Sequence, residues 1–197
     1  MRHASTLGLI LGLAAVISSD TAAQEPRPVD MTAAPAPVTA AVARADFAIK
    51  ELQGTLVARL TTAMASGGPA AAVSVCRDEA QQLTTAIAKK HGLAIGRTSH
   101  RLRNPANAPR PWAATTVAAH AGRKVADAQP VVLAFDGRVG VLRPIGTLDF
   151  CVTCHGPRET VDAAIGSVLE TAYPQDQAVG FAPGDLRGWV WAEVTLD

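Results

Sequence analysis

The longest hydrophobic pattern of the chain lies in residues 42–65, where apolar side chains recur mainly at steps of three and four residues. This spacing places them on one face of a helix. The positions that carry the pattern are Phe47, Ile49, Leu52, Leu56, Val57, Leu60 and Met64. Gly67 and Gly68 end this helix, and Pro69 suits the first turn of a second helix that runs to about Lys90. The sequence therefore predicts an N-terminal helical hairpin.

A different pattern follows in the second half of the chain. Two apolar runs, Val131–Phe135 and Val139–Ile145, are joined by an Asp-Gly pair, which is typical of a tight turn between antiparallel strands. Alternating apolar positions in Gly188–Leu196 predict a terminal strand, and Leu93–Thr98 is expected to form a short one.

Two shorter helices are expected at Trp112–Gly122 and Thr160–Thr171. Residues 103–111 contain three Pro and two Asn, a composition typical of a turn or loop. Together these elements predict an α+β fold in which a small antiparallel sheet is packed with helices.

The first 23 residues have the pattern of a secretory signal peptide. A short basic start is followed by the apolar run Leu7–Ile17 and by Thr-Ala-Ala, so we expect cleavage after Ala23. The apolar run is shorter than the ~20 residues that a transmembrane helix needs, and no other stretch approaches that length. We therefore expect a periplasmic protein with no stable membrane insertion after the signal is removed.

One domain is expected after the signal peptide. Residues 24–40, rich in Pro and Ala, are predicted to form a disordered or extended leader, and residues 41–197 the folded domain. The 18 basic and 17 acidic residues leave a net charge of +1 without a basic run. This balance argues against a nucleic-acid partner.

The most specific chemistry lies directly after the predicted β-hairpin. Residues 151–155 form a Cys-x-x-Cys-His motif, which predicts an attachment site for a c-type haem. The thiols of Cys151 and Cys154 can add to the two vinyl groups of one porphyrin, and His155 is then placed to bind the iron as the proximal ligand. The predicted cofactor is one covalent haem c. Its attachment would require the cytochrome c maturation machinery of the exported compartment.

Two other interpretations of the cysteine pair are weaker. A structural zinc site needs further Cys or His residues at similar spacing, and the chain holds only one other cysteine. A redox-active dithiol is expected to follow a strand and open a helix. Pro and Gly instead punctuate both flanks of the motif, at Pro144, Gly146, Gly156 and Pro157.

The second axial position of such a haem has several candidate ligands, which are Met31, Met64, Cys76, His91, His100 and His120. Met31 lies in the predicted leader, Met64 on an apolar helix face, and His91 at a helix C-terminus that favours a protonated imidazole. Cys76 is the odd cysteine, because haem attachment consumes the other two. It is either a buried inert thiol or a thiolate bound to iron, and His100 stays open as an alternative.

A series of segments in a fixed order resembles a bacterial family of mono-haem c-type domains, the Tll-type haem domains. The segments are Arg97–Ser99, Arg103–Pro109, the Cys-x-x-Cys-His-Gly motif, Tyr173–Phe181 and Gly184–Gly188. The resemblance extends from about Phe47 to Val194.

This resemblance implies a PAS-like α+β fold that encloses one haem with an axial Cys/His pair. Cys76 matches the position of the family's cysteine ligand, and His155 matches the proximal histidine. The chain departs from the family pattern after Trp112, where Ala113 stands in place of an acidic residue. It departs again at His100, where an apolar residue is more usual.

Three arginines in these segments are candidates to pair with the haem propionates, because a guanidinium binds a carboxylate in a fork. They are Arg97, Arg103 and Arg187. Each of them can equally form an ion pair with an Asp or Glu at the protein surface. Tyr173 is a candidate either to cover the haem or to join the core.

A thiolate ligand stabilises ferric iron, so a Cys/His pair predicts a low reduction potential. The predicted function is low-potential electron transfer with a redox partner protein that the sequence does not identify. The alternative is a periplasmic redox or gas sensor that works through a separate partner. An enzyme is not expected, because a six-coordinate iron leaves no open site and thiols bound to haem cannot exchange disulfides.

Overall fold

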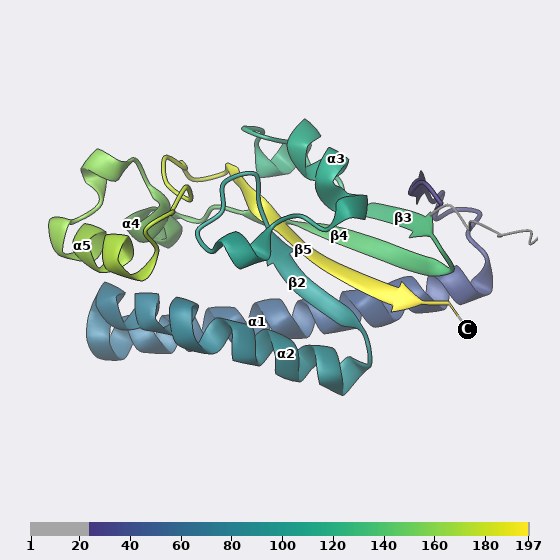
Figure 1. The fold of residues 1–197 in the computed structure, drawn as a ribbon, viewed down its shortest axis with the longest axis horizontal. Coiled ribbons are helices and arrows are strands. Elements are labelled where there is room, and N and C mark those ends of the chain that lie inside the picture. Colours follow the sequence, from purple (N-terminus) through teal and green to yellow (C-terminus); the bar gives the residue numbers. More distant parts are fainter. Residues whose placement is uncertain (1–23, 197) are drawn as a thin grey trace, which may run out of the picture.

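The computed structural model of the protein describes residues 24–196, so the predicted signal peptide at 1–23 lies outside the described residues. At its centre is a five-stranded antiparallel sheet in the order β1-β3-β4-β5-β2 (Figure 1). The strands are β1 Arg27–Pro28, β2 Ala94–Thr98, β3 Val131–Phe135, β4 Arg138–Gly146 and β5 Leu186–Thr195. Helices pack against this sheet, and the predicted α+β class is confirmed.

The β-hairpin predicted around the Asp-Gly pair is present. The pairing of β3 with β4 ends at Phe135 and Arg138. Both residues of the turn between them have positive φ, 45° at Asp136 and 68° at Gly137. A two-residue turn of this kind matches the twist of antiparallel strands. β5, the last strand in the chain, lies between β4 and β2 and completes the centre of the sheet.

The predicted helical hairpin is also present. It consists of α1 Ala36–Ser74, the π-helix η1 Val75–Glu79 and α2 Ala80–His91. Gly68, with φ 67° and ψ −164°, interrupts α1 at the point where the chain reverses. Ion pairs of 2.6 Å between Arg59 and Glu79 and of 2.7 Å between Glu51 and Lys90 join the two antiparallel arms.

The segment expected to form a leader is partly built into the fold. β1 pairs with the open edge of β3, and the Val29 N–H donates to a β3 carbonyl at 3.0 Å. α1 begins at Ala36, upstream of the start expected for the folded part. The physical reason is that β3 would otherwise expose unpaired backbone groups. Pro28, which has no N–H, is tolerated because β1 is itself the outer strand.

Hydrophobic clusters cover both faces of the sheet. The hairpin buries one face, and α1 contributes small and branched side chains such as Ala48 and Leu52 there. On the other face, α3 Pro111–Ala119 packs Trp112 on Phe135 with ring centroids 5.5 Å apart. Phe47, expected on the apolar face of α1, is 65% exposed and contacts His91 instead.

A third, smaller cluster lies at the end of the molecule where the hairpin reverses. There α4 Val152–His155 and α5 Ala163–Ala172 lie over the hairpin end (Figure 1). The cluster consists of Val73, Ile165, Leu169 and Tyr173. Short 3-10 turns complete the connections: η2 Pro105–Asn107, η3 Val125–Asp127, η4 Asp149–Cys151 and η5 Arg158–Thr160.

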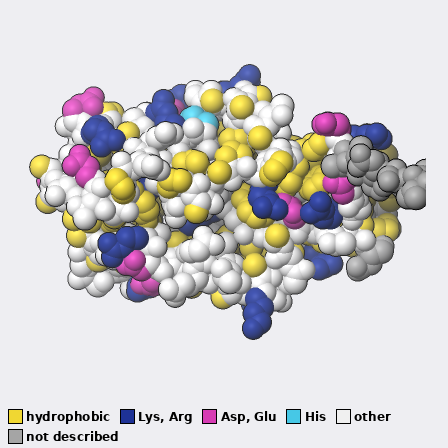
Figure 2. All heavy atoms as spheres, in the orientation of Figure 1, with side chains coloured by type: hydrophobic (Ala, Val, Ile, Leu, Met, Phe, Trp, Pro, Cys, Tyr) yellow, Lys and Arg dark blue, Asp and Glu magenta, His cyan; other side chains and the backbone are white. Residues whose placement is uncertain are grey.

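On the face shown in Figure 2, Lys and Arg side chains are scattered, and several lie beside Asp or Glu. Of the helices within residues 24–196, none is long and apolar enough to cross a membrane.

Candidate functional site

The Cys-x-x-Cys-His segment forms a short helical turn after β4. η4 leads directly into α4, and Gly156 ends the turn. A Cβ at Gly156 would lie 2.6 Å from the Val152 carbonyl oxygen, so the close approach requires glycine. Residues three apart on a helical turn face the same side. Cys151 and Cys154, both free and half-buried, are therefore presented together.

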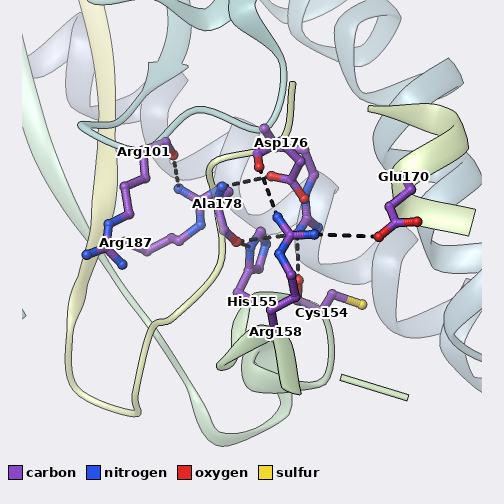
Figure 3. Close-up of polar contacts among 9 residues, drawn as sticks. Arg101, Cys154, His155, Arg158, Glu170, Asp176, Ala178 and Arg187 are labelled. Atoms are coloured by element: carbon purple, nitrogen blue, oxygen red, sulfur yellow. Dashed lines mark hydrogen bonds and ion pairs between the residues drawn. The ribbon is translucent and has the colours of Figure 1, made fainter. Parts of the chain in front are cut away.

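The imidazole of His155 is held by one backbone hydrogen bond. Its Nδ1 lies 2.7 Å from the carbonyl oxygen of Ala178 (Figure 3). Because a carbonyl oxygen only accepts, Nδ1 must carry the proton, and Nε2 keeps a free lone pair. The Phe181 ring lies edge-on to the imidazole, with centroids 6.4 Å apart.

Electrostatics keep this imidazole neutral. Burial lowers the pKa of His155 well below its ordinary value, and the charges of Arg187 and Arg103 lower it further. A neutral imidazole with a free Nε2 is the form that binds a metal ion. The second nitrogen's bond to a backbone carbonyl also matches the usual support of a metal-bound histidine.

Cys76 lies close to the motif although it comes from the helical hairpin. It belongs to the π-helix η1, which lies in the second arm of the hairpin, between Gly68 and α2. Its charge raises the pKa values of Cys154 and Tyr173, and it opposes the lowering of the pKa of Arg97. Burial is the main cause of each of these shifts. Val73, one helical turn before Cys76, belongs to the third cluster, and Cys154 packs against the same cluster, so Cys76 lies near the Cys-x-x-Cys-His turn. The role of Cys76 as a ligand stays a prediction.

Tyr173 lies near the Cys-x-x-Cys-His turn and also belongs to a hydrophobic cluster. It is the C-cap residue of α5 and a member of the third cluster. Burial and the nearby Cys76 raise the pKa of its phenol to about 12, so the hydroxyl stays protonated. The Arg103 guanidinium lies 6.0 Å from the centroid of its ring.

Arg103 has protein partners in this structure. Its Nε donates to Asp176 Oδ2 at 3.0 Å, and its Nη2 donates to the backbone carbonyls of Cys154 and Ala178. The side chains of both Arg103 and Asp176 are buried, 10% and 6% exposed. These contacts connect the Cys-x-x-Cys-His turn to the loop that supports His155.

Arg97 and Arg187 differ from Arg103 because neither forms an ion pair with a carboxylate within residues 24–196. Burial lowers the pKa of Arg97 and lowers that of Arg187 to about 10. The Nε of Arg187 is buried and has no hydrogen-bond partner in the described part of the chain. Its guanidinium lies 5.1 Å from the Phe181 centroid, and Nη1 donates weakly to the Arg101 carbonyl at 3.4 Å (Figure 3).

The charges of this site do not cancel. Burial and the charges of Arg103 and Arg97 lower the pKa of Arg187, whereas the carboxylate of Asp176 raises it. Asp176 is also the ion-pair partner of Arg103. Three cations and one anion leave two positive charges in a partly buried space. Because a buried unpaired charge is costly, the arrangement fits a bound group that carries two carboxylates.

Comparison with known proteins places the chain in a family. A family model described as Tll0287-like matches residues 15–194. This chain belongs to the Tll0287-like family. A crystal structure titled "cyanobacterial heme-protein Tll0287" has the same fold, with a TM-score of 0.60 and 23% sequence identity over 83% of this chain and 98% of that one. Among curated proteins, no match was found.

The family predicted from the ordered sequence segments is therefore confirmed. In this Tll0287-like chain, the other candidate ligands have partners or positions of their own. His91 Nε2 lies 2.8 Å from Glu51. The His120 ring packs edge-on against Trp189, with centroids 5.3 Å apart, and Trp189 belongs to the cluster on the α3 side of the sheet. Met31 precedes α1 and is 40% exposed.

His100 lies at the edge of the site. Its ring packs edge-on against Phe181 with centroids 5.8 Å apart. Burial and the charges of Arg101 and Arg187 lower its pKa. His100 and His155 therefore both pack against the Phe181 ring.

Sequence reasoning missed the residues that support His155. Asp176 and Phe181 were part of the segment that resembles the Tll0287-like family, but no role followed from their types alone. The one available signal was a single acidic residue in a short loop rich in Pro, Gln and Gly. Its pairing with Arg103, distant in the sequence, is visible only in three dimensions.

Proposed function

We propose that this protein is an exported mono-haem c-type protein that acts in low-potential electron transfer. Haem would be bound covalently through Cys151 and Cys154, with His155 and Cys76 as axial ligands. The observation that carries this proposal is the state of His155, which is neutral, hydrogen-bonded at Nδ1 and free at Nε2, beside two unlinked thiols. The name of the related heme-protein Tll0287 supports the same cofactor.

Each residue of the site has a distinct task in this proposal. When bound, the haem would supply an iron that takes up and releases one electron. Cys76, as a thiolate, would favour the ferric state and lower the reduction potential. Arg97 and Arg187, which have no carboxylate partner within residues 24–196, would neutralise the two propionates.

The remaining residues would limit access to the metal. Tyr173 and Phe181 are both buried beside the site and would exclude water from it. With Cys76 and His155 in both axial positions no site stays open for a substrate, so we propose a carrier and not an enzyme. Its redox partner protein is unidentified, and the periplasmic location follows from the signal-like pattern of residues 1–23.

One observation favours a second candidate, a periplasmic redox or gas sensor that acts through a separate partner. Cys76 lies in a π-helix, a rare helical form that is frequently found at functional sites. If Cys76 left the metal on reduction, η1 could return to regular helix. That change would shift α2 relative to α1 and alter the outer surface of the hairpin.

Production in a cell with a cytochrome c maturation system tests the proposed cofactor. We expect the denatured protein to gain the mass of one haem and to begin at Gln24. The variant Cys151→Ser/Cys154→Ser should lose the covalent haem. An unmodified wild-type mass would overturn the haem assignment, and an intact signal peptide would overturn export.

Ferric electron-paramagnetic-resonance spectra test the ligands. We expect a low-spin signal with thiolate character in the wild type. Cys76→Ser should remove that character and raise the reduction potential by more than ~59 mV, a tenfold change in the ferric-to-ferrous ratio. The matched control is His100→Gln, which should leave the spectrum unchanged. A Cys76→Ser spectrum identical to that of the wild type would exclude Cys76 as a ligand.

A further inference from the structure

The hydrogen bond of His155 depends on the position of one backbone carbonyl. The acceptor, at Ala178, belongs to an irregular loop between α5 and β5. The conformation of this loop is held by Asp176, whose Oδ1 accepts the Ala178 N–H at 2.7 Å. The Asp176 N–H in turn donates to the Tyr173 carbonyl at 2.9 Å. Because the loop has no regular secondary structure, these two bonds help to fix the direction of the Ala178 carbonyl.

Arg103 locks the same loop to the Cys-x-x-Cys-His turn. Its guanidinium binds Asp176 on one side and the carbonyls of Cys154 and Ala178 on the other, the last at 3.4 Å. Figure 3 shows the residues that supply these acceptors, Cys154, Asp176 and Ala178, close to His155. We call the ion pair of Arg103 and Asp176, with its two carbonyl contacts, the Arg103–Asp176 bridge.

Backbone hydrogen bonds also hold this loop: the Gly180 N–H donates to the Gly156 carbonyl at 2.8 Å, and the Phe181 N–H donates to the His155 carbonyl at 2.9 Å. The other side-chain contacts of the loop are weaker or more exposed than those of Arg103 and Asp176. Arg158 donates to the Asp176 carbonyl at 3.4 Å from an exposed position and forms a loose 3.9 Å ion pair with Glu170. Arg101 binds the Val179 carbonyl at 2.9 Å, also from an exposed position. Within residues 24–196, the guanidinium groups of Arg101 and Arg158 form no hydrogen bond to the Cys-x-x-Cys-His turn.

We infer that the Arg103–Asp176 bridge is a positioning device that sets how strongly His155 donates electrons to its metal. A histidine whose Nδ1–H is held by a well-placed acceptor is a more basic ligand and favours the higher oxidation state. The bridge keeps the Ala178 carbonyl within 2.7 Å of Nδ1. It acts through His155 and is not itself a ligand.

Since this inference rests on the proposed function, its test needs one measurement with haem and one without. The chosen variant is Arg103→Lys, which keeps the positive charge and loses the planar fork that reaches three acceptors at once. A purely electrostatic role of Arg103 predicts wild-type behaviour for this variant. A positioning role predicts a loss.

In the haem-loaded protein, Arg103→Lys should raise the reduction potential. We expect a change of about tenfold in the ferric-to-ferrous ratio at fixed potential, which corresponds to ~59 mV. Asp176→Ala should act in the same direction. Arg158→Lys is the matched control, because Arg158 contacts the same loop from an exposed position, and it should leave the potential unchanged.

In the chain produced without haem, nitrogen-15 NMR of the His155 ring supplies the second readout. The wild type should show the Nδ1–H tautomer, whereas Arg103→Lys and Asp176→Ala should show a mixture of tautomers. Should Arg103→Lys leave both the tautomer and the potential at their wild-type values, the inference is wrong. A tautomer shift in a chain that never acquires haem would sustain the positioning role while overturning the proposed function.

Discussion

At the scale of single residues, partners decide what identical side chains do. Arg103 and Arg187 are both half-buried near His155, and the sequence offered both as propionate partners. The structure gives Arg103 a carboxylate and two carbonyls, whereas the Nε of Arg187 has no hydrogen-bond partner in the described part of the chain. Arg103 is thus satisfied by the protein, and Arg187 is suited to a bound anion.

This difference leads to a prediction for Arg187→Met. A buried cation without a carboxylate destabilises the chain that lacks haem, so the substitution should raise its free energy of unfolding by about 1–3 kcal/mol. In the haem-loaded protein the same substitution should be destabilising, because it leaves a propionate unpaired. Urea unfolding of both forms measures the two effects.

The control for this prediction is Arg158→Met, whose side chain is 58% exposed. It should change the stability of either form by less than ~0.5 kcal/mol. If Arg187→Met destabilised both forms equally, its guanidinium would be serving the fold through Phe181 and not a bound anion.

At the scale of elements, the sequence predicted secondary structure best where the backbone conformation allows only a few residue types. The Asp-Gly turn between β3 and β4 was predicted correctly because only a few residues tolerate positive φ at both turn positions. The helix boundaries were less accurate, and the π-helix η1 was not predicted. The extra residue of a π-helical turn hardly changes the spacing of hydrophobic residues. The packing of the whole helix decides where such a turn forms.

The reversal of the hairpin gives a prediction at this scale. Gly68 has φ 67° and ψ −164°, a region that is essentially restricted to glycine, and its missing Cβ would meet nothing within 4 Å. Gly68→Ala should therefore lower the free energy of unfolding by about 1–3 kcal/mol through backbone strain alone. Thermal and urea unfolding measure the change.

Gly54 is the matched position in the same helix. It is exposed in the helical part of α1, and its missing Cβ would likewise meet nothing within 4 Å. Gly54→Ala should raise the free energy of unfolding by about 1 kcal/mol, because alanine is the better helix former. A stabilising Gly68→Ala would show that the reversal does not require the observed backbone conformation.

At the scale of the whole molecule, the site is assembled from segments far apart in the sequence. Cys76 comes from the hairpin, Arg103 from the loop after β2, His155 from α4, Asp176 from the loop after α5 and Arg187 from β5. The small cluster beneath them is separate from the two clusters that cover the sheet. The site region therefore has less hydrophobic support of its own than the sheet has.

This arrangement predicts how stability is distributed. In the chain without haem, residues 148–181 should exchange amide hydrogens much faster than β4 and β5, because local opening there exposes few buried contacts. Covalent haem with ligands from both sides should slow that exchange by at least about tenfold. Hydrogen exchange followed by mass spectrometry compares the two forms. Equal protection of residues 148–181 in both forms would argue against haem binding between these segments.

The sequence by itself determined the features that short stretches of chain encode. Helical and strand periodicities, the Asp-Gly turn and the Cys-x-x-Cys-His motif are each contained within a few consecutive residues, and so the α+β class and the family followed from them. Local patterns did not predict the strand in residues 24–40, because the pairing of β1 with the edge of β3 joins segments about a hundred residues apart.

Only the tertiary structure decided which side chains share the site and what state they are in. The sequence named Cys76, Arg103 and His155 without showing that Asp176 connects two of them. Contacts between distant segments depend on how hairpin, sheet and loops pack, and no local pattern records that packing. Burial is set at the same level, and it is the main cause of the lowered pKa values of His155 and Arg187.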